Sequence, residues 1–144
     1  MKPEETIDFH IRWAWHGIAR IYNNEEAQHG LSMSTGYVLL SIDHHNGTPS
    51  TKLGLMMGME PRSLVRTLQS MEEEGLIRRK ADKDDKRVVR IFLTEKGKKK
   101  RDISKEKVIQ FNEFIQKKVG KKKLKDFFDV MNDVNTIINE EKIF

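Results

Sequence analysis

The chain has 144 residues, of which 37% are hydrophobic and 34% are charged, and its formal net charge is +5. This length suits one domain with its own core, and the high charged fraction favours long amphipathic helices or a small protomer that shares its core with a partner. The absence of cysteine excludes a disulfide framework, a thiolate metal site and a cysteine redox switch. There is no signal-peptide pattern and no apolar stretch of membrane-spanning length, so we expect a cytoplasmic protein that does not enter a membrane.

Residues 4–28 have the pattern of an amphipathic helix. Apolar residues recur along it at spacings of three and four, at Ile7, Ile11, Ala14, Ile18 and Tyr22. Phe9, Trp13 and Trp15 lie off this stripe, so the helix is apolar on more than one face. Such a helix fits a dimer interface better than the surface of a lone domain.

A break around Gly30 separates this helix from a short one that is expected to be buried. Ser32 and Ser34 are candidate N-caps for it, and residues 37–42 are mostly apolar. Residues 46–49, Asn-Gly-Thr-Pro, then predict a turn that stops the helix.

Two helices joined by a tight turn follow. The first is expected to have its cap at Ser50 or Thr51 and to end at Gly58. The second is expected to begin at Pro61 and to stop at Gly75. Its spacing predicts a buried stripe with one further apolar residue beside it: Leu64, Leu68 and Met71, with Val65 adjacent.

A basic hairpin comes next. Residues 76–77 and 88–93 have the β-branched side chains and partial alternation of strands, and residues 82–86 form an exposed connection. Helix, tight turn, helix and a charged two-stranded wing are the layout of a winged helix-turn-helix, which places one helix in a DNA groove. Residues 52–101 hold fifteen Lys and Arg against eight Asp and Glu, whereas the remainder is slightly acidic. The positive charge coincides with this motif and favours a polyanionic partner.

Two long helices are expected to complete the chain. Thr94 and Glu95 cap the first, which runs to residue 119, and Gly120 separates it from the last helix. No linker or repeat divides the chain, so we expect one domain, residues 1–144, that is mainly α-helical with a small β-wing.

Five segments of the chain carry a specific combination of motifs. They are Thr51-Lys52-Leu53-Gly54, Arg62-Ser63-Leu64-Val65-Arg66, Met71-Glu72-Glu73-Glu74-Gly75-Leu76-Ile77, Asp85-Lys86-Arg87 and Leu93-Thr94-Glu95-Lys96-Gly97. In this combination the chain resembles the MarR family, the multiple-antibiotic-resistance-type bacterial repressors, whose wing carries Asp-x-Arg followed by Leu-Thr-x-x-Gly. The resemblance implies a homodimer whose first and last helices intertwine, binding to a palindromic operator in double-stranded DNA, usually repression, and often release by a small ligand. It places a winged helix-turn-helix at residues 34–101, between dimerisation helices at 1–30 and 103–144.

Candidate DNA contacts lie first on the second helix of the motif. The N-terminal turns of a recognition helix face base edges and phosphates, and here they present Pro61, Arg62, Ser63, Arg66, Thr67 and Gln69. Arg62 and Arg66 are four residues apart and share the face opposite the buried stripe. An arginine fork can bind O6 and N7 of guanine together. A solvated helix face or an ion pair is the alternative for both arginines.

The wing supplies a second set of candidate contacts. Arg87 at its tip can enter the narrow minor groove, and Lys83 and Lys86 can touch phosphates. A carboxylate beside phosphates is repelled, so Asp85 is expected to support an arginine of the wing or of the recognition helix by an ion pair.

Aromatic residues near the predicted dimer region suggest an effector pocket, formed by Trp13, Trp15, His16, Met33 and Tyr37. The alternative is that these residues form the dimer core. The histidines lack the spacing of metal ligands, so we expect neither a metal nor another cofactor.

No phosphate-binding glycine loop, serine elbow or pair of carboxylates in an apolar run is present, so we do not expect an enzyme. Two other functions stay open: a winged-helix module that binds proteins rather than DNA, and a small-molecule-binding enzyme built on a helical dimer. The basic wing speaks against the first, and the lack of convergent titratable groups speaks against the second.

Overall fold

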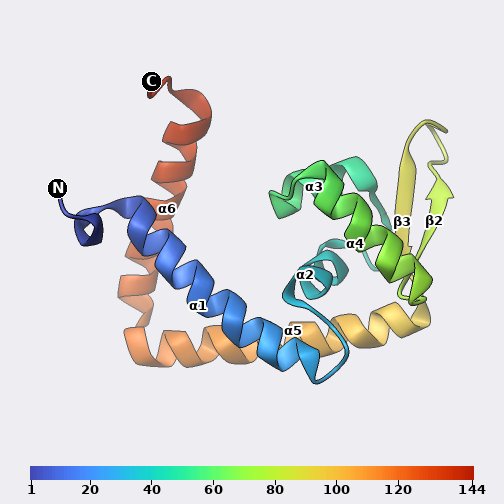
Figure 1. Cartoon of the computed structure of the whole chain (residues 1–144), viewed down its shortest axis with the longest axis horizontal. Coiled ribbons are helices and arrows are strands. Elements are labelled where there is room, and N and C mark those ends of the chain that lie inside the picture. The colour runs from blue at the N-terminus through green and yellow to red at the C-terminus, as the bar shows by residue number, and fades with distance from the viewer. The chain divides into compact units, whose positions relative to one another are not determined.

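The computed structural model describes residues 1–144, and most of them lie in helices or in one small sheet (Figure 1). A short 3-10 helix (Pro3–Glu5) precedes the elements α1 (Ile7–Ala27), α2 (Met33–Ser41), β1 (Thr48–Pro49), α3 (Ser50–Met57), α4 (Pro61–Glu73), β2 (Ile77–Ala81), β3 (Val89–Leu93), α5 (Glu95–Val119) and α6 (Lys121–Glu140). The predicted fold class, mainly helical with a small wing, is confirmed. The chain divides into two compact units, residues 1–107 and residues 108–144.

Helix α1 begins at Ile7, where its apolar stripe starts, and not at residue 4 as predicted. The Thr6 side chain accepts a hydrogen bond from the backbone N–H of Phe9, 3.4 Å away, and therefore caps the helix. At the other end, the carboxylate of Glu26 is only 3% exposed and accepts a hydrogen bond from the hydroxyl of Ser104 at 3.0 Å. This contact ties the end of α1 to the first half of α5.

The hydrophobic core lies within the first unit, between α2, α3, α4 and the sheet. Its buried residues are Leu31, Val38, Leu39, Ile42, Leu53, Leu64, Leu68, Met71, Leu76, Ile77, Ile91 and Leu93. The predicted stripe on α4 is thus confirmed. Val65, which lies beside that stripe as expected, is 58% exposed because its position on the helix turns it away from the core.

The segment before α3 differs from its prediction in two ways. Residues 48–49 form a strand, β1, which pairs with β3 in an antiparallel ladder. Gly47 allows this close approach, because its φ is +66° and a Cβ there would lie 2.6 Å from the carbonyl oxygen of Ile91. The predicted cap at Ser50 or Thr51 was wrong: Pro49 is the N-cap residue of α3, and no side chain caps the helix.

The sheet has the strand order β1-β3-β2, and β2 is longer than its sequence pattern indicates. Residues from Ile77, opposite Leu93, to Ala81, opposite Val89, all pair with β3. Backbone hydrogen bonds hold this strand although its side chains after Ile77, which alternate between the two faces of the sheet, are all exposed.

The start of α5 docks on the end of α4 through residues of the Leu-Thr-x-x-Gly motif. The Thr94 hydroxyl donates to the Gly75 carbonyl and accepts from the backbone N–H of Gly97 at 3.0 Å, so Thr94 caps α5 as predicted. Gly97 lies so close to Leu76 that a Cβ there would collide with the Leu76 carbonyl oxygen. The last strand of the wing is followed directly by Thr94 and α5. These contacts therefore fix the position of the wing relative to α4.

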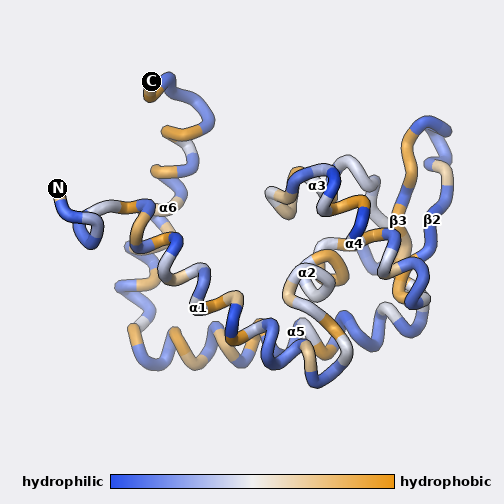
Figure 2. Tube along the Cα trace, in the orientation of Figure 1, coloured by the Kyte–Doolittle hydropathy of each residue, from blue (hydrophilic) through white to orange (hydrophobic).

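The second unit, residues 108–144, comprises the end of α5 and all of α6, and none of its side chains is buried. Apolar and polar residues alternate along α6 (Figure 2). Phe114, Phe127 and Phe128 are 60%, 52% and 54% exposed. None of the helices of the chain combines the length and the apolar character needed to cross a lipid bilayer.

Candidate nucleic-acid interface

Helix α4 buries one face and presents the other. Leu64, Leu68 and Met71 are at most 6% exposed, whereas Arg62 and Arg66 lie on the outer face. Neither arginine makes an ion pair or a hydrogen bond through its side chain. The structure therefore does not show the ion pair that was the alternative for these two arginines. Both guanidinium groups are available to a ligand.

Charge changes sign along α4. Its first turns are basic, while its end carries Glu72, Glu73 and Glu74. All three acids have partners: Glu72 lies 3.6 Å from Arg79, and the other two accept hydrogen bonds from Gln69 and Ser70 one turn earlier. Only the N-terminal half of the outer face is thus positively charged.

The N-terminus of α4 adds its own attraction for an anion. Glu60 is the N-cap residue, but no side chain caps the helix. The free backbone N–H groups of the first turn and the helix dipole favour a negative group at this end. Pro61 and Ser63 are exposed there, and the Thr67 hydroxyl donates to the Ser63 carbonyl at 3.0 Å, which leaves its oxygen free to accept.

The wing tip presents one arginine in a fixed orientation. The Arg87 side chain is 91% exposed, and its Nε and Nη2 donate to the two carboxylate oxygens of Asp85, each at 3.1 Å. The Arg87 side chain is also the main reason that the pKa of Asp85 is lowered from its ordinary value. Asp85 therefore pairs within the wing and not with α4. Lys83 and Lys86 are exposed and have no side-chain partner.

Two residues of the wing were missed by sequence reasoning. Arg90 on β3 donates through Nε to Asp82 at 2.8 Å and through Nη1 to the carbonyls of Asn46 and Gly47 at 3.2 and 3.3 Å. Asp82 had been placed in an exposed connection, yet its side chain is 11% exposed. The Arg90 hydrogen bond is the main cause that lowers the pKa of Asp82. The only signal in the sequence was a pair of opposite charges on either side of a turn, which many hairpins share.

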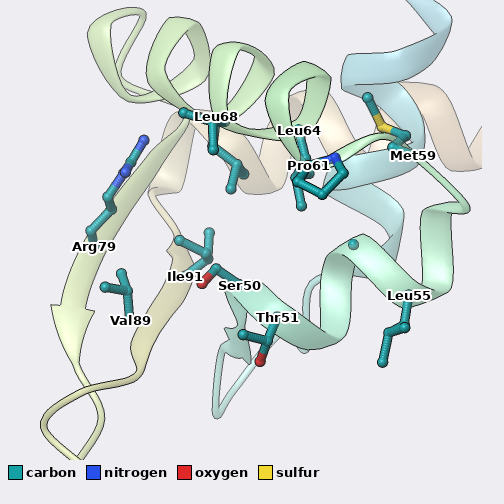
Figure 3. Close-up of a pocket in the computed structure, with 12 residues that line it drawn as sticks. Ser50, Thr51, Leu55, Met59, Pro61, Leu64, Leu68, Arg79, Val89 and Ile91 are labelled. Atoms are coloured by element: carbon teal, nitrogen blue, oxygen red, sulfur yellow. The ribbon is translucent and has the colours of Figure 1, made fainter.

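An open apolar groove of about 580 Å³ lies beside α4, between α3 and the strands of the wing (Figure 3). Leu64 and Leu68 of α4 and Ile91 of β3 point into it. Leu55, which is 86% exposed, lies on α3 at its rim. The groove leaves one flank of α4 accessible next to its basic outer face.

The predicted effector residues are only partly brought together. Trp15 stacks on Tyr37 with ring centroids 6.3 Å apart, and the Tyr37 ring also meets the edge of Tyr22. Burial raises the pKa of Tyr22 to about 12, so its hydroxyl stays protonated. Trp13 is two residues from Trp15 and therefore points to another side of α1, where it stacks on Phe9.

The other two predicted effector residues add little enclosure. His16 is exposed, and Met33 is half-buried at the start of α2. Within one chain the predicted residues do not line a single pocket, because Trp13 and Tyr37 lie on different sides of α1. No cluster of three or more His, Asp or Glu side chains is placed to hold a metal ion.

Residues 31–89 match the model of the MarR family. The HTH-type transcriptional regulator TtmR of Methylorubrum extorquens (strain PA1) is 32% identical over 94 residues, which are 65% of this chain and 48% of that protein. This chain thus matches about half the length of that relative. Both matches are to transcriptional regulators, in agreement with the prediction that the chain is not an enzyme.

Solved structures show the same fold over nearly the whole chain. The MepR–DNA complex from S. aureus superimposes with a TM-score of 0.83 at 15% identity, covering 91% of this chain and 97% of that one. The PcaV regulator from Streptomyces coelicolor, solved in complex with its natural ligand, superimposes with a TM-score of 0.80 at 15% identity. The match covers 94% of this chain and 95% of that one. The sequence match thus assigns residues 31–89, which hold the helix-turn-helix and the first strand of the wing hairpin, to the MarR family, and the solved structures show that nearly the whole chain has the same winged helix-turn-helix fold.

Proposed function

We propose that this chain acts as a homodimeric repressor that binds a palindromic operator in double-stranded DNA and is released by a small ligand. The observation that carries the proposal is the outer face of α4. Arg62 and Arg66 lie there four residues apart, exposed and unpaired, on a helix whose opposite face is buried. Two free guanidinium groups on a rigid helix are suited to phosphate and guanine recognition.

The proposed contacts divide between the two DNA grooves. The first turns of α4 enter the major groove, where Arg66 and Arg62 bind base edges or phosphates. The smaller polar groups nearby contact the backbone or bases: Pro61, Ser63, Thr67 and Gln69. Arg87 enters the flanking minor groove, while Lys83 and Lys86 touch phosphates. The acids at the end of α4 keep that end away from the DNA backbone.

A second copy of the chain is the proposed partner in the dimer. The interface would use residues 1–30 and 103–144. Ile7 and Trp13 on α1 are 63% and 73% exposed, and residues 108–144 bury no side chain. Apolar surface of this extent is typical of an interface rather than of a monomer surface. Two-fold symmetry then places the two half-sites about 34 Å apart, one turn of the double helix.

Ligand release is the part of the proposal that rests on the aromatic residues. The stacked rings of Trp15 and Tyr37 join α1 to α2, next to the proposed dimer helices. A ligand that binds there with different affinity in two dimer arrangements would shift the spacing of the two α4 helices. The same fold has been solved with DNA in MepR and with a natural ligand in PcaV.

The test is a mobility-shift assay with genomic fragments, followed by fluorescence anisotropy on the fragment that is retained. We expect the affinity for DNA to fall steeply with salt, because bound lysines and arginines displace counterions. The logarithm of the binding constant should fall with the logarithm of the salt concentration, with a slope of about −0.9 for each phosphate contacted. The double variant Arg62→Ala/Arg66→Ala should lose specific binding. A matched control, Lys122→Ala/Lys123→Ala on α6, removes the same charge outside the proposed DNA surface, and once sedimentation equilibrium shows that this variant is still a dimer it should bind nearly as the wild type does.

Two results would count against this function. Absence of any retarded fragment at micromolar protein would favour a winged-helix module that binds proteins. Equal loss of affinity in the α4 and α6 variants would mean that binding depends on overall charge and not on the α4 surface.

A further inference from the structure

The tip of the wing is connected to the helix-turn-helix body by a continuous chain of hydrogen bonds. It begins at the carbonyls of Asn46 and Gly47, in the loop before β1, which accept from Nη1 of Arg90. Nε of the same arginine donates to Oδ1 of Asp82 at 2.8 Å. One planar guanidinium therefore bridges two parts of the chain that are far apart in the sequence.

The series of hydrogen bonds continues from Asp82 into the tip. The Oδ2 atom of Asp82 accepts hydrogen bonds from the backbone N–H groups of Asp84 and Asp85, each at 3.1 Å. The carboxylate of Asp85 then receives both the side chain and the backbone N–H of Arg87. Each of these links is short, and together they run from the body of the domain to the exposed arginine.

The inner and outer ion pairs of the wing differ in exposure. The side chains of Arg90 and Asp82 are 29% and 11% exposed, whereas those of Arg87 and Asp85 are 91% and 42% exposed. Solvent and salt screen an exposed pair strongly, so the inner pair is the better anchor. The outer pair can exchange its partner for a phosphate or a base edge while the inner pair stays closed.

We propose that Asp82 and Arg90 are positioning residues that hold the wing tip on the body of the domain and so orient Arg87 toward DNA. This inference rests on the proposed function of the chain. A hairpin tip without such links is mobile and must be ordered when it binds, which weakens binding. With the links in place the tip is ordered before DNA arrives.

Removal of Asp82 distinguishes positioning from simple charge. Asp82→Ala adds one positive charge to the DNA-facing wing, which by electrostatics alone should tighten binding. If Asp82 instead positions the wing, its removal should weaken DNA binding. Asp84→Ala is the matched control, because it removes the same charge two residues away and the Asp84 side chain has no partner.

The experiment is anisotropy on the retained DNA fragment at one salt concentration. We expect Asp82→Ala to weaken binding by roughly three- to tenfold, a part of the roughly 5- to 150-fold that a fully lost arginine contact can give. Asp84→Ala should bind as tightly as the wild type or more tightly. Arg90→Lys keeps the charge but loses the planar fork, and it should weaken binding in the same direction as Asp82→Ala.

A double-mutant cycle tests whether the effect passes through Arg87. In the Arg87→Ala background, Asp82→Ala should cause a clearly smaller further loss, limited to the lysine contacts of the tip, because the oriented arginine is gone. Thermal unfolding should stay cooperative with only a small drop in Tm, and the base preference supported by Arg66 should be unchanged, which separates a displaced wing from a misfolded domain.

The outcomes separate the two proposals. If the wild type binds DNA but Asp82→Ala binds as tightly as Asp84→Ala, the positioning role is wrong and the proposed function stands. A full loss that persists in the Arg87→Ala background would also overturn the positioning role, since Asp82 would then act on another part of the surface. Absence of wild-type binding would remove both proposals.

Discussion

Residues 31–93 and residues 108–144 contain similar apolar side chains but bury them to opposite extents. In the first stretch Val38, Leu39 and Leu53 are 0% exposed, whereas Phe127 and Phe128 in the second are more than half exposed. Burial stabilises a fold by about 25 cal/mol per Å² of apolar surface. The winged helix-turn-helix therefore has a core of its own, while the second stretch gains little from its apolar residues unless another surface covers them.

Charge is also distributed unevenly along the chain. Residues 52–101 hold fifteen Lys and Arg against eight Asp and Glu, whereas residues 108–144 hold seven Lys against six Asp and Glu. Most of the excess positive charge thus lies on the recognition helix, the wing and the start of α5, and little of it lies in the stretch that exposes apolar surface. This division supports separate roles in DNA binding and in assembly.

The largest expected effect tests the self-contained core. Leu39→Ala should lower the free energy of unfolding by about 2–5 kcal/mol, because it leaves a cavity at a fully buried position. Leu55→Ala, at a position that is 86% exposed, should change it by no more than about 0.5 kcal/mol. Urea unfolding of both variants at one protein concentration makes the measurement. Equal losses would show that the core is not where the structure places it.

The second prediction concerns the apolar surface of residues 108–144. Phe127→Ala should weaken the proposed dimer by about 2–4 kcal/mol, since buried aromatic residues dominate interfaces. Sedimentation equilibrium gives the dissociation constant. Asn132→Ala, an exposed polar position on the same helix, is the control and should leave it unchanged. If the wild type stayed monomeric at high concentration, residues 108–144 would not form a dimer interface, because no second copy would cover their exposed apolar surface.

A third prediction examines the basic surface. Arg66→Ala should weaken specific DNA binding by about 1–3 kcal/mol and relax the preference at one base position. Anisotropy with operator variants that differ at single positions would measure both effects. The same loss on random DNA would instead identify Arg66 as a phosphate contact.

The smallest expected effect is a pH dependence at the junction of α1 and α5. Burial raises the pKa of Glu26 from its ordinary value of 4.5, although Ser104, His29 and Lys107 act in the opposite direction. The folded state therefore binds a proton more readily than the unfolded state, and stability falls as pH rises from 4.5 through the raised pKa.

The variant Glu26→Gln keeps an acceptor for Ser104 without the charge. It should unfold at a higher temperature than the wild type at pH 7, and the difference should shrink as the pH is lowered toward 4.5. Calorimetric melting across this range measures the difference. If the difference in melting temperature did not change with pH, the charge of buried Glu26 would not be the cause of the lower stability of the wild type.

Local chemistry explains what could be predicted from the sequence. Pro61 starts α4, Gly75 follows its end and Thr94 caps α5 as expected, because each acts on the backbone within a few residues of itself. The stripe of Leu64, Leu68 and Met71 was likewise readable from helical spacing. The outer face that carries Arg62 and Arg66 follows from the same periodicity, so the main part of the candidate site lay in the sequence.

Contacts between distant segments were decided only by the tertiary structure. Strand β1 exists because residues 48–49 come alongside β3, and Val65 is exposed because the core closes on the neighbouring face of α4. The bridge from Arg90 to Asp82 and to the loop before β1 joins residues up to 44 positions apart. The sequence by itself thus determined the helices, the cap of α5 and the basic face of α4, since those depend on near neighbours. Which side chains meet across the fold, and hence how the wing is held, depended on packing that no local pattern encodes.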